Sequence, residues 1–194
     1  MKEKTRALAL TAILIAITLV LGLLPIGFIT IPGFIEITLM CIPVLVGTLV
    51  LGWRVGLPLG ALFALTSIIV ALSGRSVLGT MLLEDSIVKT LVLLIVPRLL
   101  IPLVAFLIYR VMRAKKDALN IAVAGAAGSV TNTVVFLVML NLMFPDLVAG
   151  QVFTFAAFIN GAAEAVLAAL VCPPIVKALK KSVPPLERPK EKTA

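Results

Sequence analysis

Long runs of apolar residues, separated by short polar or charged segments, make up most of the chain. A membrane-spanning helix needs about 20 mainly apolar residues, and the pattern predicts six such spans. The first follows the basic start MKEKTR, and the last ends before a charged terminal segment. The pattern therefore predicts an all-α integral membrane protein with one six-helix domain over residues 1–181. The six predicted spans are residues 5–24, 36–52, 55–73, 92–113, 118–143 and 153–178.

The segments between the spans carry their own signals. Prolines and glycines in residues 25–36 (PIGFITIPGFIE) predict a break after the first span. GWRVG predicts a tight turn between the second and third spans. Residues 73–96 are too polar for a clean span, so we expect a long loop there, with room for a short helix. Residues 182–194 are rich in proline and charge, which predicts a disordered cytoplasmic tail.

Composition excludes a soluble protein. Hydrophobic residues make up 61% of the chain and charged residues only 13%, against about 25% charged residues in ordinary globular proteins. The mean hydropathy is +1.21. No G-x-x-x-x-G-K-[ST] phosphate loop is present, and the spans leave no room for a nucleotide-binding domain. Uphill transport would therefore draw its energy from another subunit or from an ion gradient.

The net charge of +8 reflects topology. Fourteen of the 17 lysines and arginines fall in four clusters between or beyond the spans, as in cytoplasmic loops that follow the positive-inside rule. This distribution predicts that both termini lie in the cytoplasm, and it argues against a nucleic-acid partner. The clusters are Lys2, Lys4 and Arg6; Arg54; Arg110, Arg113, Lys115 and Lys116; and six residues from Lys177 to Lys192.

Catalytic and metal-binding residue types are scarce. The chain has no histidine, which removes Ser-His and Cys-His catalysis and most transition-metal sites. Its two cysteines, Cys41 and Cys172, are 131 positions apart and show no metal or redox spacing. We therefore expect no enzyme activity, no metal and no cofactor.

Four polar residues inside the spans are the candidate functional residues, because such side chains are costly in hydrocarbon. They are Arg98, Asn132, Asn160 and Glu164, and the last two share a helix face because they are four positions apart. At 1.5 Å per residue, Arg98, Asn132 and Glu164 lie about 18, 22 and 20 Å from the inner ends of their helices. This common depth predicts one pocket that opens outward.

Two interpretations of this polar layer remain open. Arg98 and Glu164 can form a buried structural ion pair, with the asparagines joining helices. Alternatively, Arg98 binds an anionic ligand, because the planar guanidinium donates two parallel hydrogen bonds to a carboxylate. Pro97 is expected in the first turn of the fourth helix, where proline is tolerated. Pro102 is expected to kink that helix.

Small residues recur every four positions and predict close helix packing. Such stripes do not by themselves distinguish internal packing from a subunit interface. They are Ala12 and Ala16; Gly56, Gly60 and Ala64; and Ala157, Gly161, Ala165 and Ala169.

The ordered motifs resemble the substrate-binding S-component of energy-coupling-factor (ECF) vitamin transporters. The resemblance covers residues 5–180 and includes TAILIA, with Ala12 and Ala16, and GWRVGLPLGALFALTS. VPRLLIPLVAFLIYR, GSVTNTVVFLVML and NGAAEAVLA are most similar to the pantothenate-specific members. The resemblance implies a multi-pass protein of a bacterial cell membrane that captures a vitamin from outside.

The resemblance also implies partners and site residues. The S-component docks on a transmembrane coupling subunit driven by two cytoplasmic ATPases, and Ala12 and Ala16 would contact the coupling subunit. Arg98 would bind the carboxylate of pantothenate. The amide and hydroxyls of the vitamin would contact polar groups on the last two helices. These are Thr131, Asn132, Asn160 and Glu164.

Other functions remain alternatives at this point. Relatives that bind folate, riboflavin, niacin or pyridoxine share the same plan. A stand-alone ion-coupled carrier is less well supported, because the sequence shows no inverted repeat or pair of broken helices. A helical scaffold without a ligand would leave the common depth of the polar groups unexplained.

Overall fold

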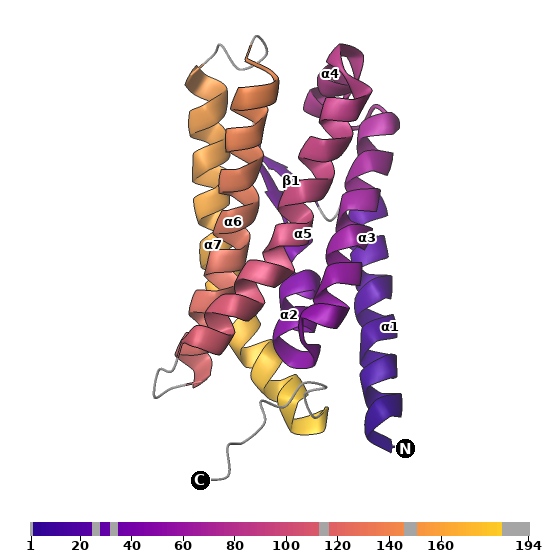
Figure 1. Ribbon diagram of the computed structural model, residues 1–194, viewed down its shortest axis with the longest axis vertical. Coiled ribbons are helices and arrows are strands. Elements are labelled where there is room, and N and C mark those ends of the chain that lie inside the picture. The colour runs from indigo at the N-terminus through magenta and orange to yellow at the C-terminus, as the bar shows by residue number, and fades with distance from the viewer. Residues whose placement is uncertain (1, 25–27, 32–34, 113–116, 146–150, 184–194) are drawn as a thin grey trace.

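The computed structural model describes residues 2–24, 28–31, 35–112, 117–145 and 151–183. Its long helices run side by side, and the start of α1 and the end of α7 lie at the same end (Figure 1). The Arg6 guanidinium joins these two ends by donating a hydrogen bond to the Ser182 carbonyl at 3.3 Å. In chain order the elements are α1 (Lys2–Leu23), β1 (Phe28–Ile31), β2 (Ile35–Thr38), α2 (Cys41–Leu51), α3 (Trp53–Leu72), α4 (Val77–Asp85), α5 (Ile87–Val111), α6 (Asp117–Met143) and α7 (Gln151–Ser182).

Five described helices, α1, α3, α5, α6 and α7, are long and apolar enough to cross a membrane. They confirm a helical membrane protein and five of the six predicted spans. The six-span count and the cytoplasmic location of both termini stay predictions. So does the single domain over residues 1–181. The predicted tail begins at Ser182, which ends α7, and its residues 184–194 lie outside the described residues.

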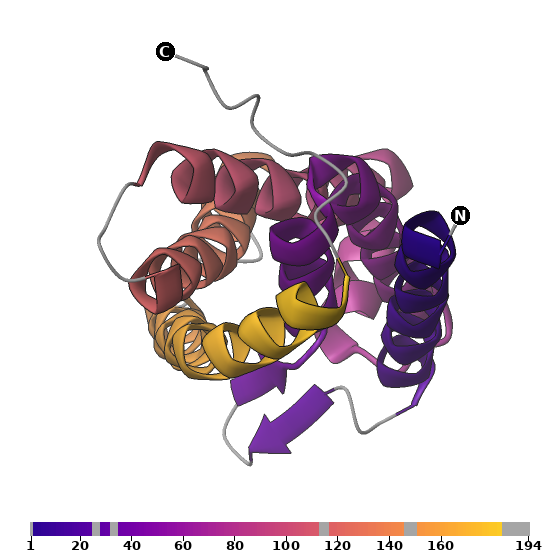
Figure 2. The same ribbon diagram turned by 90° about the horizontal axis from the view of Figure 1, so that it is seen from below.

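The second predicted span differs from the structure. Its first residues form β2, which pairs antiparallel with β1 in the register Phe28↔Thr38 to Ile31↔Ile35. β2 also contacts α7, and Figure 2 shows the hairpin at the edge of the bundle, between α1 and α7. The purely α-helical prediction is therefore wrong for this segment. Its β-branched isoleucines and threonines favour strands, and apolar periodicity alone does not separate a short strand from a helix.

The helix α2 has only 11 residues, about 17 Å at 1.5 Å per residue. It begins at Cys41, with Pro43 in the first turn, where the missing N–H leaves no helical hydrogen bond unmade. It ends at Leu51 and is followed by Gly52, whose φ of 98° favours glycine. This residue forms the predicted tight turn, and α3 starts immediately after it.

Residues 73–96 were expected to form a long loop with room for a short helix, but most of them form α4 and the first part of α5, so the loop prediction is wrong there. The Ser76 hydroxyl begins α4 by accepting a hydrogen bond from the Gly79 N–H at 3.1 Å. An extended Ser86 separates the two helices. The Thr90 hydroxyl lies within hydrogen-bonding distance of the Leu82 carbonyl (2.7 Å) and the Ser86 carbonyl (2.8 Å), which holds α4 against α5.

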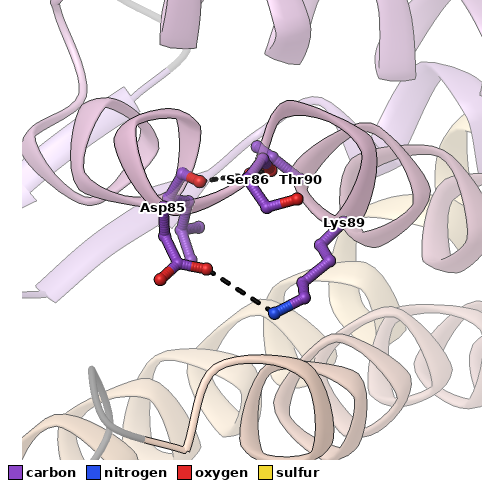
Figure 3. Close-up of polar contacts among 5 residues, drawn as sticks. Asp85, Ser86, Lys89 and Thr90 are labelled. Atoms are coloured by element: carbon purple, nitrogen blue, oxygen red, sulfur yellow. Dashed lines mark hydrogen bonds and ion pairs between the residues drawn. The ribbon is translucent and has the colours of Figure 1, made fainter.

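The acidic end of α4 also contacts α5. Figure 3 shows Asp85 and Lys89 facing each other across the junction, at 3.7 Å, with both side chains about half exposed. These charges are therefore solvated charges at the helix ends. The fourth span begins at Ile87, five residues earlier than the predicted residue 92.

Two apolar clusters stabilise the described bundle. The main core joins α1, α2, α3, α5, α6 and α7, and most of α2 is buried within it. A smaller outer cluster, defined by buried Leu82, Leu93, Leu140 and Phe144, joins α4, α5 and the end of α6. Phe63 and Ile101 belong to the main core, whereas Leu93 belongs to the outer cluster. Arg98 lies between Leu93 and Ile101 in α5 and thus between the two clusters along that helix.

Candidate functional site

Pro97 and Arg98 lie inside α5, eleven and twelve residues into the helix. The prediction that Pro97 begins the helix is therefore wrong. A proline inside a helix has no N–H for the carbonyl four residues earlier, so the Leu93 carbonyl loses its usual partner. The Arg98 guanidinium donates to this carbonyl through one terminal nitrogen, Nη1, at 3.4 Å. Pro97 thus creates an acceptor for the side chain of the next residue.

Pro102 has the same effect on the backbone of Arg98. It removes the N–H that would bond to the Arg98 carbonyl. Helix α3 approaches that carbonyl closely, because a Cβ added to Gly60 would lie 2.7 Å from the Arg98 oxygen. A Cβ at Gly56 would likewise lie 2.7 Å from Pro102 Cβ. The predicted small-residue stripe of this helix therefore packs inside the molecule, against α5.

Two aromatic rings flank the Arg98 side chain. Its guanidinium carbon lies 5.4 Å from the centre of the Phe63 ring, on α3, and 5.2 Å from that of Phe136, on α6. Both distances suit cation–π attraction, which is stronger where water is excluded. Phe63 is only 1% exposed. The Arg98 Nε atom is buried and has no hydrogen-bond partner within the described residues.

Asn132 and Glu164 lie in the same region. Glu164 is 6% exposed and is close enough to Arg98 for their charges to attract. Asn132 is 8% exposed and donates through Nδ2 to the sulfur of Cys41 at 3.9 Å. Its Oδ1 is buried and makes no hydrogen bond to any described residue. Cys41 also lies near Arg98, so α2, α5, α6 and α7 contribute to one polar cluster.

The remaining two predicted site residues are half-buried. Thr131 is half-buried, and its hydroxyl donates to the Ala127 carbonyl in its own helix at 2.7 Å. Asn160 is half-buried, one helical turn before Glu164 in α7. Arg98, Asn132 and Glu164 therefore lie in one region of the fold, whereas the described contacts do not join Thr131 to them, and the ligand-binding role of all these residues stays a prediction.

Several site residues were missed by the sequence interpretation. Cys41 was treated as part of a longer span, although Pro43 indicates a helix start near it. Phe136 follows Asn132 by one turn and so shares its helix face, a spacing that would have identified it. The sequence interpretation also did not single out Ser129. This residue is fully buried, and its hydroxyl has no hydrogen-bond partner in the described part of the chain. Phe63 could not be identified from the sequence, because its contact with Arg98 depends on how α3 packs against α5.

Gly60 offers a test of this packing. We expect Gly60→Ala to destabilise the protein by about 1–3 kcal/mol, because overpacking against a backbone atom costs this much. Gly125→Ala is the matched control, since its Cβ would meet Ala168 and Cys172 at ordinary distances of 3.4 and 3.5 Å. Helical Gly→Ala is otherwise stabilising by about 0.5–1 kcal/mol. Thermal unfolding in detergent measures both variants, and equal stabilities would contradict the close approach of α3 and α5.

The face of α1 that carries Ala12 and Ala16 is exposed within this chain. The opposite face is buried and contributes Ala7, Leu10 and Leu14 to the main core. Helical spacing separates the two faces by roughly half a turn. This small-residue stripe is therefore available to a second protein, unlike the stripe of α3.

A buried polar cluster between membrane-spanning helices is typical of membrane proteins that bind or carry a small polar molecule. The family model described as "ECF transporter, substrate-specific component" matches residues 6–176. The chain therefore belongs to this family, and the resemblance noted in the sequence is confirmed. It is a multi-pass protein of the cell membrane and a transporter component, which is a different class from enzymes.

A curated relative is similar over nearly its whole length. It is the pantothenic acid transporter PanT of Lactococcus lactis subsp. cremoris (strain MG1363). The two sequences are 28% identical over 196 residues, covering 93% of this chain and 97% of the relative.

Proposed function

We propose that this chain binds pantothenate from outside the cell and delivers it to the other subunits of an ECF transporter. One observation carries the proposal. A buried guanidinium nitrogen of Arg98 and a buried amide oxygen of Asn132 both lie in one cluster without hydrogen-bond partners among the described residues. Such groups are costly unless a ligand or water pairs with them. The similarity to a pantothenic acid transporter supports pantothenate as the ligand.

The chemistry of pantothenate matches these groups. Its carboxylate would bind Arg98, since a charged, bidentate hydrogen-bond pair suits a dry site. Its amide and two hydroxyls would contact Asn132, Asn160, Glu164 and Thr131, and its two methyl groups would contact apolar walls. The N-terminus of α2 adds a favourable field, because helix N-termini attract anions and Cys41, the first residue of this helix, contacts Asn132.

We also propose a topology and an assembly. The hairpin and α2 together complete a sixth crossing, which places both termini in the cytoplasm with the basic clusters. Ala12 and Ala16 on the exposed face of α1 contact a transmembrane coupling subunit. Two cytoplasmic ATPase subunits supply the energy, because the chain has no phosphate loop of its own.

A panel of vitamins tests the ligand assignment. We expect pantothenate to raise the midpoint of thermal unfolding of the purified chain, because a ligand that binds only the folded state stabilises it. At 100 times the Kd the stabilisation is about 2.7 kcal/mol. Folate, riboflavin, niacin and pyridoxine serve as controls and should produce no shift. A shift with one of these and none with pantothenate would assign the chain to another vitamin.

A further inference from the structure

We propose that Pro97, Phe63 and Phe136 are positioning residues that orient Arg98 for the carboxylate of its ligand. The Leu93 carbonyl and these two rings form what we call the Arg98 cradle. The inference rests on the proposed function, because it concerns how the pantothenate site recognises a carboxylate. It adds three residues that do not themselves need to touch the ligand.

The first part of the cradle is the acceptor created by Pro97. In an ordinary helix the Leu93 carbonyl would bond to the backbone N–H at position 97, and Pro97 has none. Residues in membrane helices tolerate this loss when another group pairs with the carbonyl. Here that group is Nη1 of Arg98, at 3.4 Å. The proline therefore ties one end of the guanidinium to the backbone of its own helix.

The second part is the pair of rings. Phe63 and Phe136 come from different helices, α3 and α6, and lie at similar distances of 5.4 and 5.2 Å from the guanidinium carbon. Phe63 belongs to the main core, and Phe136 packs against the outer cluster. Both rings are thus anchored independently of Arg98. Their attraction stabilises a cation that burial would otherwise disfavour.

These contacts determine which pair of guanidinium N–H groups of Arg98 can bind a carboxylate. Nη1 is engaged by Leu93, whereas the buried Nε has no partner among the described residues. A carboxylate binds two parallel N–H groups of arginine. The cradle therefore directs the edge formed by Nε and the other terminal nitrogen, Nη2, toward the ligand. A side chain held in this way loses little freedom on binding, and this preorganisation increases affinity.

Replacing Pro97 is expected to change the stability of the protein and its affinity for pantothenate in opposite directions. In Pro97→Ala, the new N–H competes with Arg98 for the Leu93 carbonyl. We expect a more stable protein that binds pantothenate about 5- to 10-fold more weakly. Pro58→Ala is the control, because Pro58 also interrupts a helix, α3, but is exposed and does not precede the arginine. It should leave the affinity unchanged.

The contact between the Phe136 ring and Arg98 is tested with substitutions that keep nearly the same side-chain shape. Phenylalanine with one, two or three ring fluorines is placed at position 136 only, which progressively weakens the negative face of the ring. We expect the Kd for pantothenate to rise steadily, to about 10-fold at the third fluorine. The Kd for pantothenol, the alcohol that replaces the carboxylate, should stay constant. Phe106→Leu, two turns further along α5 from Arg98, is the control and should alter neither ligand.

The possible results separate the two proposals. A wild-type chain that binds no pantothenate overturns the proposed function and, with it, the role of the cradle at this ligand. If the wild type binds pantothenate through Arg98 but fluorination and Pro97→Ala leave its Kd unchanged, only the cradle is overturned. A parallel loss of affinity for pantothenate and pantothenol would also overturn it, because a general packing defect explains that result. Selective loss for pantothenate supports the cradle.

Discussion

Arg98→Ala is expected to weaken pantothenate binding by about 100-fold or more while the protein stays folded. Removing one partner of a buried, hydrogen-bonded charge pair costs about 2–5 kcal/mol, and each 1.4 kcal/mol is tenfold in affinity. The carboxylate of the ligand would remain in a buried site beside the rings of Phe63 and Phe136 and the acidic Glu164, without the cation that paired with it. Equilibrium binding of radiolabelled pantothenate to the purified variant measures the loss.

Two controls make this result specific to the carboxylate. Arg98→Lys keeps the charge but loses the planar fork, so its affinity should fall between those of the wild type and Arg98→Ala. Pantothenol should bind Arg98→Ala about as well as it binds the wild type. The midpoint of thermal unfolding is expected to fall in Arg98→Ala, because the buried Glu164 loses the positive charge near it, so the Kd is compared at a temperature where the variant is folded. Unchanged pantothenate affinity in a folded variant would exclude Arg98 from the site.

Enlarging the exposed stripe of α1 is expected to abolish uptake without changing ligand binding. Small residues let membrane helices approach closely, and Ala12 and Ala16 face away from the core of this chain. The double substitution of both alanines by phenylalanine would hold a partner helix away by several ångströms. We expect pantothenate uptake by cells that express the complete transporter to fall to background. The purified variant should keep the wild-type Kd.

A control on the same helix tests whether the location matters. Ile17 is 42% exposed and points about 100° away from Ala16 around the helix axis. Ile17→Phe places an aromatic ring of the same size outside the stripe, and uptake should remain near the wild-type rate. Normal uptake in the variant with phenylalanine at positions 12 and 16 would contradict the proposed contact between α1 and the coupling subunit. An equal loss of uptake in Ile17→Phe would contradict it as well.

The sequence predicted those features that depend on local pattern. Long apolar runs identified five spans, and Gly52 identified the turn between α2 and α3. The cost of burying polar groups identified Arg98, Asn132 and Glu164, which the fold brings together. The common depth that the helical rise predicts for these three residues stays a prediction.

Features that depend on tertiary contacts were not predicted. Local rules place a proline at a helix start, yet Pro97 lies within α5, where the Arg98 side chain pairs with the carbonyl it releases. The short α2 was missed because strand and helix share the same apolar composition between Ile35 and Leu51. The aromatic contacts of Arg98 come from two other helices, so no spacing within α5 could identify both.

The most direct test is whether this chain alone binds pantothenate. The wild-type protein would be purified, placed in lipid nanodiscs without coupling or ATPase subunits, and equilibrated with radiolabelled pantothenate. We predict saturable binding of one molecule per chain, displaced by unlabelled pantothenate. A chain that unfolds cooperatively on heating, and is therefore folded, but shows no saturable binding would contradict the account.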